Sequence, residues 1–196
     1  MVYETTNIDH FFELLKKHKE MSSKDLAEHL KYSPETVEKI GQTFEKLGVV
    51  ELIYPIMGCP KIKLLKSLHT GHKEEPERKA FDHYNISSDH VSCNIKLVDD
   101  KVKQSKKYIL DVPKLKPYTS MFLESLRDLI TDKVSLEVTD MMDNSKVSKL
   151  KANFFVVVKD ILKEYFPDKH HIKVISAELI HRMYGLGKIE ILLTDP

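Results

Sequence analysis

The chain has 196 residues, of which 41% are hydrophobic and 31% are charged, which is the composition of an ordinary globular protein of one or two domains. No apolar run approaches the ~18 residues needed to span a bilayer, and the start, MVYETTNIDH, lacks the layout of a signal peptide. The formal net charge is +1, and residues 1–70 contain ten lysines and ten acidic residues, so the basic excess of most nucleic-acid binders is missing.

The first thirty residues predict two helices. Apolar residues recur at helical spacing near residues 7–19, at positions Ile8, Phe11, Phe12 and Leu15. Ser22 or Ser23 caps the second helix, whose apolar face contains Leu26 and Leu30. A short turn around Tyr32 follows.

A third helix and a hairpin complete the predicted N-terminal unit. Ser33 occupies the cap of this helix and Pro34 its first turn, where the missing N–H costs nothing. Gly48 is expected to end the helix in a left-handed conformation. Residues 49–54 and 61–64 predict two strands joined by a turn rich in proline and glycine.

The stretch SSKDLAEHLKYSPETVEKIGQTFEKLGVVELIYP resembles a winged helix-turn-helix, so we expect residues 1–68 to form a winged-helix domain. The resemblance implies that the third helix occupies the DNA-contacting position. The possible nucleic-acid or partner contacts are polar residues of this helix and lysines of the second strand: Thr36, Lys39, Gln42, Thr43, Lys46, Lys61 and Lys63. Glu35 and Glu38 would repel phosphates, and the turn before Lys61 has no basic residue, so protein contact is favoured over DNA binding.

Residues 69–88 are polar, with glycine, proline and mixed charge, and predict a linker. Histidines and cysteines in and around this stretch raise the question of zinc: His69, His72, His83, His90, Cys59 and Cys93. No second compact pair supplies the remaining ligands at a recognised spacing, so we expect no metal site.

Residues 89–196 predict a small α+β domain. Residues 91–98 and 107–112 alternate between apolar and polar and predict two strands. Helices are expected after Pro117, from Ser145 to Phe166, and over Ile172 to Met183. The whole chain is therefore expected to be α+β: a winged helix followed by a hairpin-like sheet and three helices.

The motif Gly185-Leu186-Gly187-Lys188 invites comparison with a phosphate-binding loop, but it lacks two required residues. Arg182 stands where the first glycine belongs, and Ile189 stands where a Ser or Thr would hold Mg²⁺. We therefore expect neither a cofactor site nor a catalytic residue in this chain.

The tail resembles instead the N-terminal domain of archaeal type II/IV secretion system ATPases, the hexameric motors of pilus, archaellum and secretion machines. The resemblance depends on a helix followed by a short motif: Gly185, Gly187, Lys188, Leu192, Leu193, Asp195 and Pro196. It covers roughly residues 85–196, with Tyr108 to Pro113 as a weaker upstream match. In that family the Asp-Pro precedes a motor domain with Walker A and B motifs, and none is found here.

The resemblance implies a non-catalytic docking and regulatory region at the N-terminus of a secretion or pilus ATPase. ATP and Mg²⁺ would belong to the motor domain, which we expect to follow in the gene. The implied partners are the motor domain, neighbouring subunits and the membrane platform protein, at the cytoplasmic side of the membrane. The alternative is a winged-helix transcriptional regulator that binds DNA and has a C-terminal sensing or dimerisation domain.

Overall fold

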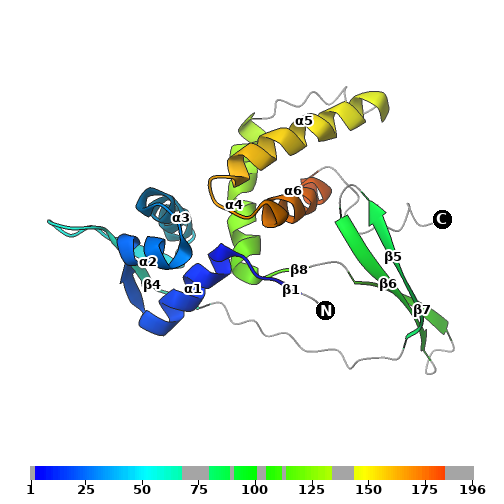
Figure 1. Ribbon diagram of the computed structural model, residues 1–196, viewed down its shortest axis with the longest axis horizontal. Coiled ribbons are helices and arrows are strands. Elements are labelled where there is room, and N and C mark those ends of the chain that lie inside the picture. The colour runs from blue at the N-terminus through cyan, green and yellow to red at the C-terminus, as the bar shows by residue number, and fades with distance from the viewer. Residues whose placement is uncertain are drawn as a thin grey trace.

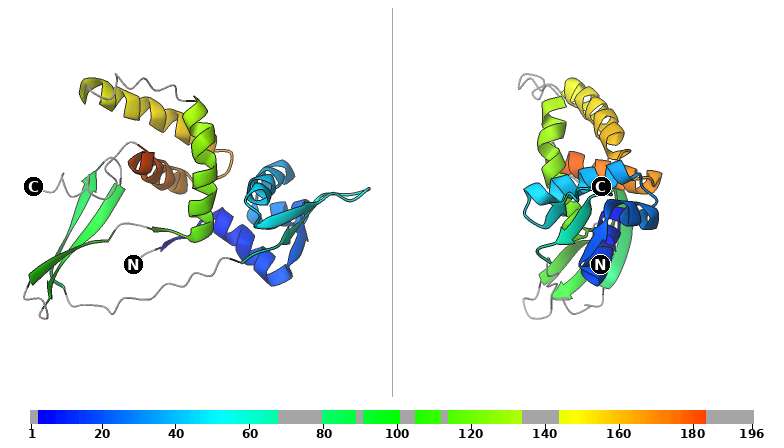
Figure 2. Two further views of the ribbon diagram at one scale, coloured as in Figure 1. Left: turned by 180° about the vertical axis from the view of Figure 1, so that it is seen from behind. Right: turned by 90° about the vertical axis from the view of Figure 1, so that its left-hand side faces the viewer.

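The computed structural model describes residues 3–67, 80–88, 91–100, 105–111, 114–133 and 144–183, and this part of the chain has a mixed α+β fold, as expected (Figure 1). The N-terminal helices lie at one end of the molecule, α4 (Pro117–Lys133) stands in the middle, and a long three-stranded sheet lies at the other end. The view from behind shows the same arrangement (Figure 2, left).

Three helices and one antiparallel sheet make up the N-terminal unit. The helices are α1 (Asn7–His18), α2 (Ser23–Leu30) and α3 (Pro34–Lys46). The sheet has the order β2-β4-β3 and contains β2 (Glu20–Ser22), β3 (Val50–Ile53) and β4 (Lys61–Leu64). The expected helices and hairpin are present, and β2 is an additional strand that pairs with β4 through Met21 and Ile62.

Local chemistry defines the ends of these helices. The hydroxyl oxygens of Ser22 and Ser33 accept hydrogen bonds from backbone N–H groups three residues later, both at 3.1 Å, so they satisfy donors that a helix start leaves free. Gly48 has a φ of 66°, and the Val49 N–H bonds the Phe44 carbonyl at 3.0 Å behind it. The expected left-handed end of α3 is confirmed.

Where the structure describes it, the second half contains three helices and a three-stranded sheet. The helices are α4 (Pro117–Lys133), α5 (Asn144–Leu162) and α6 (Lys169–Met183). The larger sheet is antiparallel, with β5 (Ala80–Ser88), β6 (Val91–Asp100) and β7 (Ser105–Asp111) in that order. A short parallel pair joins β1 (Tyr3–Glu4) to β8 (Lys114–Leu115).

Strand β5 occupies residues that the sequence assigns to the linker. Its composition is polar, but Tyr84 and Ile86 alternate with exposed residues and pair with Ile95 and Cys93 of β6. The Cys93 and Ala177 side chains bury against each other, with Ile86 and Leu110 packed around them, so one face of the sheet contacts α6. Pairing with a neighbouring strand therefore outweighs the linker-like composition.

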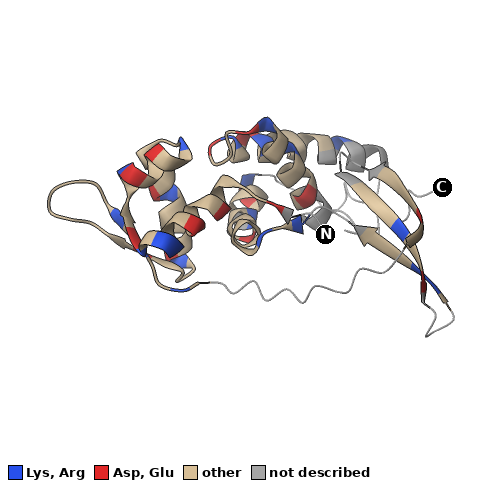
Figure 3. Ribbon diagram, turned by 60° about the horizontal axis from the view of Figure 1, so that its bottom comes forward, with Lys and Arg blue, Asp and Glu red and all other residues tan. Residues whose placement is uncertain are grey.

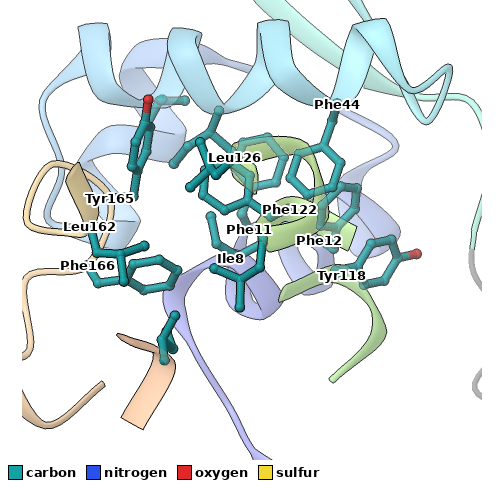
Figure 4. Close-up of a cluster of buried hydrophobic side chains, with 14 of the residues drawn as sticks. Ile8, Phe11, Phe12, Phe44, Tyr118, Phe122, Leu126, Leu162, Tyr165 and Phe166 are labelled. Carbon is teal, nitrogen blue, oxygen red and sulfur yellow. The ribbon is translucent and has the colours of Figure 1, made fainter. Parts of the chain in front are cut away.

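One hydrophobic core runs through both halves of the chain. It includes buried residues from α1, α3, α4, α5 and α6. Aromatic rings join these helices, and Phe122 of α4 lies near their centre (Figure 4). Its ring centroid is 5.8 Å from Phe44, 5.0 Å from Tyr165 and 6.3 Å from Phe166. The N-terminal unit is thus packed directly on α4.

A buried polar cluster reinforces this junction. The Asp9 carboxylate, 2% exposed, accepts hydrogen bonds from the Thr6 backbone N–H at 2.9 Å and from the Thr119 hydroxyl at 2.8 Å. Thr6 is the N-cap of α1, and Asp9 completes its capping box. Thr119 belongs to α4, so one carboxylate both caps the first helix and fixes it to the middle of the molecule.

Candidate interaction surface

The residues expected to contact a partner lie on α3 and on the hairpin β3–β4. One side of α3 is committed to the core, where Val37, Ile40 and Phe44 are fully buried. Gly41 is buried between them, and a Cβ atom there would lie 3.0 Å from Ile62 Cδ1. The absence of a side chain therefore lets α3 pack closely on the hairpin, and this contact fixes which side of the helix faces outward.

Lys39 does not project freely from this outward side. Its ammonium forms an ion pair with Glu164, in the turn between α5 and α6, and a second one with Glu35 at 3.6 Å. The hydrogen bond and the charge of Glu164 raise the pKa of Lys39 above its ordinary value. A nucleic acid would have to displace both carboxylates, so Lys39 is poorly suited to bind a phosphate.

The same turn forms a second contact beside it. The Tyr32 hydroxyl donates a hydrogen bond to the Tyr165 carbonyl, across 133 positions of sequence. Burial raises the pKa of the Tyr32 hydroxyl well above its usual range. Together with the Lys39–Glu164 pair, this bond holds the start of α3 against the end of α5, and the sequence gives no signal for either contact.

The two lysines of β4 also have acidic partners. Lys61 Nζ lies 2.9 Å from a Glu20 carboxylate oxygen on β2, and Lys63 Nζ lies 3.4 Å from one of Glu51 on β3. These pairs cross the outer face of the sheet. In Figure 3, basic and acidic residues alternate over the N-terminal unit. Three of the four lysines expected as contacts therefore have their charge balanced within the chain.

The remaining expected contacts divide between helix-bonding and open side chains. The Thr43 hydroxyl donates to the Lys39 carbonyl at 2.9 Å, and Thr36 Oγ1 lies 3.0 Å from the Ser33 hydroxyl at the helix cap. Gln42 and Lys46 are exposed. The outward side of α3 is therefore a small, mixed polar surface with one open cation.

The loop that joins β3 and β4, residues 54–60, is the most exposed apolar segment of the hairpin; we refer to it as the hairpin loop. Tyr54, Ile56 and Met57 are 60%, 105% and 89% exposed. Gly58 has a φ of 107°, which allows the chain to reverse at this point. The sequence shows that this turn has no basic residue, but its apolar exposure follows only from the structure.

A shallow groove of about 460 Å³ lies along β2 and α2. Its wall is mostly polar: His18, Glu20, Met21, Ser22, Asp25, Glu28, His29 and Lys61.

Within the residues that the structure describes, no three His, Cys, Asp or Glu side chains are placed to hold a metal ion. In the same part of the chain, no helix is both long enough and apolar enough to cross a membrane.

The tail motif that carries the family resemblance lies outside the described residues: Gly185, Gly187, Lys188, Leu192, Leu193, Asp195 and Pro196. No protein-family model, curated protein or solved structure matched the chain.

Proposed function

We propose that this chain is a non-catalytic docking and regulatory region of a hexameric secretion or type IV pilus assembly ATPase. Its N-terminal unit would be a winged helix that contacts a protein partner, and its second half would adjoin the motor domain. The tail motif is the reason for naming this class of machine, because it resembles the segment that precedes the motor in that family.

One structural observation supports protein contact over DNA binding. The lysines that would grip phosphates are paired with carboxylates, as Lys39 is with Glu164 and Lys61 with Glu20. Specific duplex binding requires several unpaired cations on one face, since each neutralised phosphate adds to affinity. A surface on which lysines and carboxylates balance each other is more typical of a contact between proteins.

The reading frame of the gene tests the link to a motor. We expect the codons that follow Pro196 to encode a G-x-x-x-x-G-K-[ST] motif within the next few hundred positions. The purified longer product should then hydrolyse ATP with Mg²⁺, and residues 1–196 alone should not. A frame without this motif would contradict the proposal.

The alternative is a DNA-binding transcriptional regulator, and the arrangement of α3 beside a hairpin favours it. Under this alternative the chain would bind duplex DNA at low salt with a steep salt dependence. Lys46→Glu would then weaken binding, while Lys169→Glu, at the start of α6 and outside the N-terminal unit, would be the matched control. A gel shift with these properties would support the regulator and count against the docking region.

A further inference from the structure

The hairpin loop extends away from the body of the molecule. Figures 1 and 2 show it from opposite sides as a narrow projection beyond the N-terminal helices. Two of its side chains, Ile56 and Met57, are almost completely exposed. An apolar point of this kind is costly in water, because its side chains order solvent with no compensating contact. The exposed side chains of the loop are therefore suited to contact an apolar surface.

The residues of the hairpin loop suit the boundary between the headgroups and the acyl chains of a bilayer. All seven residues, YPIMGCP, are uncharged, and the loop is drawn without any charged position in Figure 3. Pro55 and Pro60 carry no backbone N–H, so two fewer donors need to be desolvated. Tyr54 directly follows β3 and precedes Ile56 and Met57 in the chain, and an aromatic ring with a polar hydroxyl is typical of the headgroup level.

The shape of the loop argues against a protein pocket and against nucleic acid. A stable protein interface needs about 800 Å² from each partner, and three side chains on a narrow projection provide much less. The lysines at its base, Lys61 and Lys63, are paired with Glu20 and Glu51, so no strong positive field surrounds it. The balanced charge also implies that apolar insertion, rather than attraction to anionic headgroups, would supply the affinity.

We propose that the hairpin loop inserts Ile56 and Met57 into the boundary between headgroups and acyl chains of a lipid bilayer, with Tyr54 at the headgroup level. This inference does not depend on the proposed function, because vesicle binding requires neither a motor domain nor a platform protein. Insertion of two side chains gives weak binding, which becomes effective when several copies act together or another contact holds the protein at the membrane.

A fluorophore on Cys59 tests the insertion directly. Cys59 is exposed within the loop, whereas Cys93 is 3% exposed, so a polarity-sensitive thiol reagent labels one site. The labelled protein would be mixed with millimolar lipid as vesicles of phosphatidylcholine alone. We expect a blue shift and a rise in intensity that persist in high salt.

Matched variants identify the side chains responsible. Ile56→Asp and Met57→Asp should each weaken vesicle partitioning by about tenfold or more, because each removes one inserted apolar group. Val156→Asp is the control, since Val156 is also an exposed aliphatic residue, at 57%, but lies on α5. Unlabelled protein in a vesicle flotation assay should rank the variants in the same order.

Three results would overturn the proposal. The first is an unchanged spectrum at every lipid concentration. The second is a blue shift without vesicles that grows with protein concentration, which would indicate that the loop packs against a second copy of the chain. The third is binding that requires anionic lipid and disappears in high salt, which would indicate surface attraction without insertion.

Discussion

At the residue scale, Asp9 shows how a few polar atoms can fix the relation between distant segments. Its carboxylate joins the Thr6 backbone and the Thr119 hydroxyl inside the protein, and its other oxygen, Oδ1, is buried without a hydrogen-bond partner. Such a group is expensive to bury, so the neighbouring packing has to be strong enough to keep it in place. The cluster favours one docking of α1 on α4 over other packings of the same apolar surfaces.

Tyr32 makes the α3 contact sensitive to alkali. Burial raises the pKa of its hydroxyl in the folded chain above the unfolded value near 10. A raised pKa means that this group stabilises the fold fully below about pH 10 and that the contribution is lost as the pH rises through the folded value. We expect the free energy of unfolding, measured with urea, to fall as the pH rises above about pH 10.

Tyr32→Phe separates this effect from the general titration of lysines. At neutral pH the variant should lose about 1 kcal/mol, since the hydrogen bond to the Tyr165 carbonyl is missing. Above about pH 10 its stability should decline less steeply than that of the unaltered chain. Identical slopes for the two proteins would show that the Tyr32 hydroxyl does not titrate differently in the folded state.

At the element scale, α3 contacts the edge of the hairpin as well as its buried face. Glu45, in the last turns of α3, accepts a hydrogen bond from the Leu52 backbone N–H at 2.8 Å. β3 is at one end of the sheet order, so this N–H would otherwise be open to another strand. A side chain that occupies an edge donor protects the sheet against pairing between molecules.

Gly41 sets the distance between α3 and the hairpin. A Cβ atom there would lie 3.0 Å from Ile62 Cδ1 and 3.2 Å from Leu52 Cδ2, and both side chains are buried. We expect Gly41→Val to cost roughly 1–3 kcal/mol by overpacking, as measured by urea unfolding. Gly41→Ala should cost less, because its better helix propensity offsets the tighter contact.

Gly48→Ala is the comparison for this pair. Gly48 has open space around it but a positive φ of 66°. The substitution should therefore lower the free energy of unfolding by about 1 kcal/mol through backbone strain alone. If valine were tolerated at Gly41 as well as alanine, the close approach of α3 to the hairpin would be disproved.

Helices were easier to predict from the sequence than strands, for a physical reason. Caps and apolar periodicity are local, so Ser33, Pro34 and Gly48 define α3 without knowledge of the rest of the chain. β2 and β5 depend on partners, since each forms only because another strand lies beside it. The seven candidate contacts lie on α3 and β4, and whether they bind a partner stays a prediction. The pairing of Lys39 with Glu164 has no local signal, because the two residues are far apart in sequence.

At the scale of the whole molecule, the continuous core couples the N-terminal unit to α4, α5 and α6. Phe122 is fully buried and lies between Phe44 on one side and Tyr165 and Phe166 on the other. Phe122→Ala should therefore cost about 3–5 kcal/mol. The cavity left by this substitution would border both halves of the chain. The rate of amide hydrogen exchange should therefore rise in α3 as well as in α5.

Val156→Ala tests whether this response is specific. Val156 is exposed on α5, so its truncation should change stability by less than about 0.5 kcal/mol and leave exchange in α3 unaltered. Protection in α3 that survived Phe122→Ala would show that the N-terminal unit is stable without its contact to α4.

The bond between Asp9 and Thr119 joins positions 110 residues apart, which has a consequence for synthesis. A ribosome adds roughly 5–20 residues per second, so α1 leaves it about 5–20 s before its partner on α4 exists. During that interval Phe12, whose ring later stacks on Tyr118 with centroids 3.7 Å apart, has no permanent cover on that side. The nascent chain thus has a defined period in which its first helix is open to chaperones or to misplaced contacts.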